Sequence, residues 1–111
     1  MLTIESLKAA GAEIDSGLER CMNNEAFYLR LVQMALDNDG YASLRTALEA
    51  HDLDKGFEYA HALKGMLANV ALTNLLDPVL EMTEALRARE DRDYSGLLAQ
   101  MDAELEKLRA L

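Results

Sequence analysis

The most restrictive feature of the sequence is a set of apolar residues that recurs every three or four positions between residues 53 and 70. The set comprises Leu53, Phe57, Ala60, Leu63, Leu67 and Val70. This spacing places every member on one face of an α-helix. The pattern therefore predicts a long helix whose apolar seam faces the core of the protein.

The rest of the chain favours helices as well. Half of its 111 residues are hydrophobic, few are aromatic and proline occurs once, a composition typical of all-helical proteins. This length supports one core, so we expect a single domain over residues 1–111. Short connections between the later helices imply antiparallel neighbours. We therefore predict an all-α fold, an antiparallel up-and-down four-helix bundle with short extra N-terminal helices.

Capping residues and glycines predict the helix boundaries. Thr3 can cap a short helix that ends at Gly11, and Asp15 or Ser16 a second that ends near Met22. A longer helix is expected to begin at Asn23 or Asn24 and to end within 37–40, and another should cover 41–51. The next two helices should begin at Asp52 or Asp54 and at Thr73 or Asn74, and Pro78 is close enough to the start of the latter to be tolerated. The last helix is expected over about 93–110.

Apolar spacing also predicts the buried residues of the other helices. The expected sets are Phe27, Leu31, Met34 and Ala35; Tyr41, Leu44, Ala47 and Leu48; Leu76, Val79, Leu80, Thr83 and Leu86; and Tyr94, Leu97, Leu98, Met101, Leu105 and Leu108. His51 falls on the second of these seams, which favours a structural role. The six methionines are expected to fill the core.

Charge and cysteine content exclude several function classes. A formal net charge of −9 argues against nucleic acid and an anionic membrane surface as partners. No apolar stretch approaches the length of a transmembrane helix. The single cysteine, Cys21, excludes an internal disulfide and favours a reduced, cytoplasmic setting.

The sequence predicts no metal, no cofactor and no ATP site. With Gly40 as the glycine of an EF-hand loop, Ala35 and Thr46 would occupy positions that need acidic ligands. Asp52 and Asp54 lack a third acidic residue at a suitable spacing, so a capping role is favoured. Walker, Rossmann and nucleophile motifs are also missing from the sequence. A phosphoryl group on this chain would have to come from another protein.

His61 stands out as a candidate nucleophile. It lies about 120° from the centre of the apolar seam, on the side that also carries Glu58, Gly65, Ala68 and Asn69. Lys64 lies one turn away, where an ammonium can neutralise the oxygens of an anion carried on the ring. Gly65 destabilises a helix interior by about 1 kcal/mol relative to Ala, which suggests close approach of a partner. A phosphoryl group fits these features best, although short patterns of this kind also arise by chance.

The residues around His61 resemble a known family. Ala60-His61-Ala62-Leu63-Lys64-Gly65 is similar to the Ala-His-x-Leu-Lys-Gly signature of histidine-containing phosphotransfer (HPt) domains, and Asn69 matches a common Asn two turns further on. The resemblance extends to an upstream Leu-x-Arg…Asn-Glu…Tyr pattern and a downstream Leu-Glu pair, which here are Leu18, Arg20, Asn24, Glu25, Tyr28, Leu80 and Glu81.

This resemblance implies a phosphocarrier without kinase activity of its own. His61 would attack the aspartyl phosphate of a response-regulator receiver domain, hold the phosphoryl group on Nε2 and pass it to a second receiver. Lys64 would offset phosphoryl charge and Gly65 would admit the receiver surface, while Glu58, Ala68 and Asn69 would lie on the docking face. Receiver domains and a hybrid sensor histidine kinase are the implied partners, the metal ion would belong to the receiver, and a free-standing monomer is expected.

Several observations leave alternatives open. Met66 stands where the family usually has a small Ser or Ala, and Ala68 and Ala71 stand where Gly is frequent; these departures put the choice of partner in doubt. Glu58 could orient the His61 ring or be a solvated surface residue. The chain could also be an interaction module that docks a receiver or kinase without carrying phosphate, or an unrelated bundle that assembles with itself.

Overall fold

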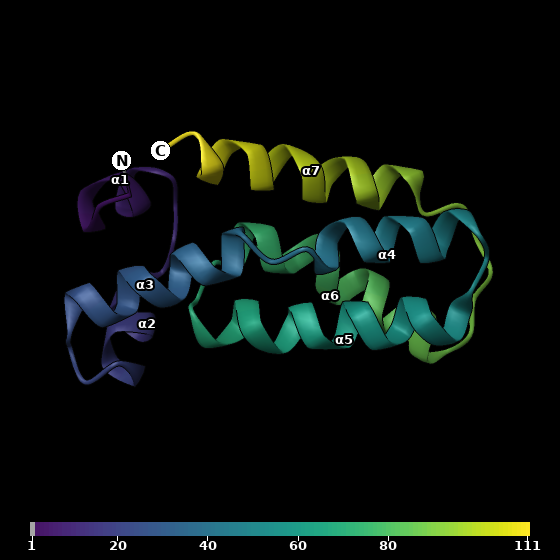
Figure 1. The fold of residues 1–111 in the computed structure, drawn as a ribbon, viewed down its shortest axis with the longest axis horizontal. Coiled ribbons are helices and arrows are strands. Elements are labelled where there is room, and N and C mark those ends of the chain that lie inside the picture. Colours follow the sequence, from purple (N-terminus) through teal and green to yellow (C-terminus); the bar gives the residue numbers. More distant parts are fainter. Residues whose placement is uncertain (1) are drawn as a thin grey trace.

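The computed structural model describes residues 2–111, and the regular structure in this range is helical (Figure 1). The helices are α1 (Ile4–Ala9), α2 (Ile14–Arg20), α3 (Glu25–Leu36), α4 (Gly40–Glu49), α5 (Leu53–Asn69), α6 (Thr73–Arg87) and α7 (Ser95–Arg109). The prediction of an all-α fold is therefore confirmed.

Helices α4 to α7 form the predicted antiparallel bundle. In Figure 1 they lie along the long axis of the molecule and alternate in chain direction. Helix α5 packs beside α4 and α6, and α7 lies on the opposite side of the bundle from α5. Helix α3 continues roughly the line of α4, and α1 and α2 lie at the same end of the molecule as both termini. The short N-terminal helices thus gather at the end where α5 finishes and α6 begins.

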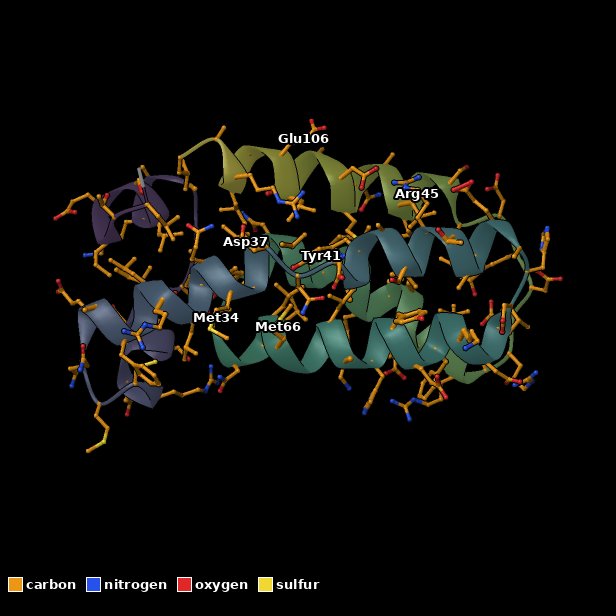
Figure 2. All side chains as sticks on the ribbon, in the orientation of Figure 1. Met34, Asp37, Tyr41, Arg45, Met66 and Glu106 are labelled. Carbon is orange, nitrogen blue, oxygen red and sulfur yellow. The ribbon has the colours of Figure 1, made fainter. Side chains whose placement is uncertain are left out.

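The junction of α3 and α4 is held by side chains that satisfy the last carbonyls of α3. The Tyr41 hydroxyl donates to the carbonyl of Ala35 at 2.9 Å, and Arg109 donates through Nε and Nη2 to that of Leu36 at 2.9 and 2.6 Å. Terminal helix carbonyls have no partner within the helix, so these bonds stabilise the junction between α3 and α4. Burial of Tyr41 raises its pKa to about 12. Figure 2 shows Arg45 on α4 extending toward α7, where it pairs with Asp102.

The core confirms most predicted buried positions but shows that the register of α3 was wrong. Phe27 and Met34 are 45% and 60% exposed, and Tyr28 and Val32 are buried in their place. Ala35 is buried as predicted and Leu31 only in part. The helix is rotated by about one residue, or 100°, relative to the prediction, because Tyr28 points inward to reach the backbone carbonyl of Val70, the residue that follows α5. In Figure 2, Met34 points away from α7.

Helix α6 shows a similar shift. Leu80 is 39% exposed and Leu76 only partly buried, whereas Leu75 and Met82 are fully buried. Helix α6 contacts both α5 and α7, so its buried arc also takes in Leu75 and Met82, whereas Leu80 lies outside that arc. Thr83 lies inside this arc as predicted, and its hydroxyl donates to the Val79 carbonyl at 2.7 Å.

Two expectations about single residue types were wrong. His51 does not lie on a core seam: α4 ends at Glu49, His51 takes a φ of +57°, and its exposed ring meets Asp91 with 2.8 Å between Nδ1 and Oδ1. The methionines do not all fill the core. Met82 and Met101 do, but Met22 is 90% exposed because it lies in the turn after α2.

The helix caps were predicted in part. The side chains of Thr3, Asn24 and Asp52 each accept a backbone N–H at the start of α1, α3 and α5. Helix α2 instead begins after Glu13 and ends at Arg20, and α6 begins after Leu72, both without a side-chain cap bond. Asp15, Ser16, Thr73 and Asn74 therefore do not cap these helices. The backbone N–H of Ser95 donates to Asp93 and lowers the pKa of that carboxyl.

Candidate functional site

Helix α5 positions the candidate site and is fixed at its start by Asp52. The Asp52 carboxylate accepts the backbone N–H of Lys55 at 3.1 Å, which satisfies a donor that the helix leaves free. Ala60, Leu63 and Leu67, which belong to the apolar seam of α5, are buried in the core. The predicted seam is therefore confirmed in its middle and at its end, while Leu53 and Phe57 at its start are only partly buried.

The flank of α5, about 120° from the centre of this seam, carries the residues singled out from the sequence. His61 is exposed, as are Glu58, Ala68 and Asn69, and Lys64 is partly exposed. A side-chain carbon built on Gly65 would meet nothing within 4 Å. Helical periodicity places these residues within about 80° of His61. The structure thus presents an imidazole on an open helix face, next to a primary amine and a residue without a side chain.

The ring of His61 contacts Phe57, which the sequence placed in the core seam. The two ring centroids are 5.5 Å apart and the planes are inclined by 18°, an offset-stacked pair. The spacing of four residues could have indicated this contact, because helical side chains lean over the preceding turn. Phe57 also contacts the Arg87 guanidinium, whose Cζ lies 5.2 Å from the ring centroid.

The end of α5 is tied to the N-terminal helices. Arg20 Nη1 donates to the carbonyls of Ala68 and Asn69 at 2.8 and 3.3 Å, and the Tyr28 hydroxyl donates to that of Val70 at 2.8 Å. Three successive terminal carbonyls thus receive side-chain donors. Desolvation raises the pKa of buried Tyr28 to about 12, and nearby Cys21 adds to the shift.

In the sequence, Arg20 and Tyr28 were noted only as matches to the upstream part of the family pattern, and no role was predicted for either. Ala71, which follows the tied carbonyls, takes a φ of +58°, a conformation that favours a residue without Cβ. This conformation explains why glycine suits that position.

Hollows flank α5 on both sides. One of about 340 Å³ lies between α4 and α5, and Asp52, Lys55 and Tyr59 help to line it. Another of about 550 Å³ lies between α5 and α6 beside Phe57, Glu58 and Arg87. His61 lines neither hollow. In residues 2–111 no group of three His, Cys, Asp or Glu side chains could hold a metal ion, and no helix is long and apolar enough to cross a membrane.

Comparison with known protein families identifies the family of the chain that carries this helix face. A family model described as the Hpt domain matches residues 28–111, which is most of the chain. The chain belongs to the Hpt domain family. No curated protein and no solved structure matches it.

Membership of the Hpt family assigns the chain a histidine phosphotransfer role in two-component phosphorelays, as a phosphocarrier module. The matched range contains α4 to α7 and most of α3, and therefore the complete Ala60–Gly65 stretch. It begins at Tyr28, so Leu18, Arg20, Asn24 and Glu25 of the upstream pattern lie outside it. The Hpt bundle and the open face of α5 are thus parts of one matched unit.

Proposed function

We propose that His61 is the phosphoryl carrier of this Hpt domain, and that it exchanges the group with receiver-domain aspartates. The observation that carries the proposal is the open face of α5, where exposed His61 stands beside Lys64 and unobstructed Gly65 in a chain of the Hpt family. Exposure is required because both donor and acceptor would be other proteins. The other histidine, His51, is also exposed but is bonded to Asp91.

The proposed step moves one phosphoryl group between proteins. The lone pair of His61 Nε2 forms a bond to phosphorus as the bond from phosphorus to the receiver's aspartate oxygen breaks, and the aspartate leaves as a carboxylate. The Nδ1 proton stays on the ring. Transfer to the second receiver reverses these bond changes. The Lys64 ammonium offsets negative charge on the transferred oxygens, in keeping with a reaction that depends on positioning and charge neutralisation.

We further propose that residues 1–111 form a single Hpt domain. The support is the contact between parts far apart in sequence: Arg20 of α2 and Tyr28 of α3 bond to the end of α5. Glu58, Ala68 and Asn69 would form the docking face around His61. Three further expectations stay predictions: that receivers and a hybrid sensor kinase are the partners, that the protein is a monomer, and that it is cytoplasmic.

A transfer assay tests the proposal. Receiver domains labelled with phosphate on their aspartate are mixed with wild-type protein, His61→Gln or His51→Gln, and the label is followed after acid and base treatment. We expect base-stable, acid-labile label on the wild type and on His51→Gln, and none on His61→Gln. Label that persists on His61→Gln would contradict the assignment. If no receiver in a broad panel releases its label, a binding module without phosphate becomes the better explanation.

A further inference from the structure

The contact between His61 and Phe57 suggests a role for an aromatic residue in the site. The rings are nearly parallel, with 18° between the planes and 5.5 Å between the centroids. This geometry lies in the favourable range for offset stacking. An exposed side chain otherwise changes rotamer on a picosecond to nanosecond timescale. Stacking on Phe57 therefore favours the rotamer in which the His61 ring leans toward the start of α5.

Phe57 is itself restrained on the side of α6. It is half-buried and packs against the core. The guanidinium of Arg87 lies over its ring, and Arg87 Nε is 3.5 Å from Glu84 Oε2 one turn earlier on α6. A cation over an aromatic face is a stabilising contact. The ring that supports His61 is therefore anchored to the neighbouring helix.

We propose that Phe57 is a positioning residue for phosphoryl transfer, which holds the His61 ring in one orientation while leaving the Gly65 side of the ring open. This inference rests on the proposed carrier role of His61. Fixing the nucleophile before the donor arrives removes part of the entropic barrier to reaction. Phe57 touches neither the phosphoryl group nor the receiver and acts only through the imidazole.

The test compares variants that differ in the ring at position 57. Phe57→Leu keeps an apolar side chain but removes the ring, Phe57→Met is a second ringless variant of different shape, and Phe57→Tyr keeps the ring. Circular dichroism establishes that each variant is folded. Proton NMR of the His61 ring reports stacking through the ring-current shift. Phosphoramidate, a small donor that needs no docking, reports the reactivity of His61: an N–P bond to the imidazole forms as ammonia leaves.

We expect Phe57→Leu and Phe57→Met to lose the ring-current shift and to react with phosphoramidate about 3- to 10-fold more slowly, from the strength of aromatic stacking. With a phosphorylated receiver the loss should fall on kcat and leave KM within about twofold. Phe57→Tyr should retain the wild-type shift and rate.

Two results would overturn the inference: wild-type phosphoramidate rates in the folded ringless variants, or a loss in Phe57→Tyr as large as in Phe57→Leu. Should receivers fail to phosphorylate the wild type, the carrier role fails. The NMR and phosphoramidate measurements would still decide separately whether Phe57 positions the ring.

Discussion

Replacing Gly65 with Ala should stabilise the fold and weaken transfer at the same time. A side-chain carbon at this position meets no atom within 4 Å, so the folded state has room for it. Gly in a helix interior is less favourable than Ala by about 0.8–1.0 kcal/mol. For a domain of this size that corresponds to a rise in melting temperature of about 4 °C. Urea and thermal unfolding measure the gain.

The same substitution should impair docking if Gly65 admits a partner. Inserting a methyl group into a close-packed contact costs about 1–3 kcal/mol, which corresponds to a weakening of receiver binding by about 5- to 150-fold. The weakening of receiver binding should lie at the lower end of this range for Gly65→Ala and higher in the range for Gly65→Gln. The assay is the KM for transfer from a phosphorylated receiver, with phosphoramidate reactivity as the measure of an intact His61.

Gly96 supplies the matched control. It lies on α7, outside the α5 face, and a side-chain carbon there also meets nothing within 4 Å. Gly96→Ala should therefore leave transfer unchanged and not destabilise the fold. The reasoning about Gly65 is refuted if Gly65→Ala lowers stability, or if Gly65→Ala and Gly65→Gln both transfer with the wild-type KM.

Two further predictions concern the ties at the ends of the helices. Gly17→Ala should destabilise the fold by about 1–3 kcal/mol, because the added Cβ would overlap the Tyr28 ring and lie 3.0 Å from the Val70 carbonyl oxygen. A free energy of unfolding in urea within about 0.5 kcal/mol of the wild-type value would contradict this. Alkaline pH should also unfold the protein. Burial raises the pKa values of Tyr28 and Tyr41 from 10.0 to about 12, so their contribution to stability is complete below pH 10 and lost between pH 10 and 12; tyrosinate absorbance that accounts for all four tyrosines near pH 10, while circular dichroism stays native, would refute it.

Local periodicity was enough to predict the bundle and the candidate face of α5. The spacing from Ala60 to Val70 fixes which side of α5 is buried, and with it the exposure of His61 and Gly65. Asp52 was a correct cap because its side chain acts within one turn. These features depend on residues close together in the chain, and the sequence displays them directly.

Features set by other helices could not be read from the sequence in this way. Phe27 and Met34 have the spacing of a buried seam, yet they are exposed because the Tyr28 hydroxyl bonds to Val70, 42 residues away. Leu75 and Met82 are buried although they were not part of the predicted seam, because α6 contacts both α5 and α7. His51 left its expected seam because α4 ends before reaching it. In the first two cases contacts between helices override a local pattern, and in the third the helix ends before the pattern does.

The supports of α5 suggest how an Hpt domain with so exposed a site keeps its geometry. Asp52 fixes the first turn, and Arg20 and Tyr28 bond to the last three carbonyls. With both ends of the helix held, the freedom that remains at the site is that of side chains. An exposed imidazole is free to change rotamer unless a neighbour restrains it, and Phe57 is the residue that stacks on it. Substitutions at the helix ends should therefore act mainly on stability, whereas those at position 57 should act on the rate of transfer.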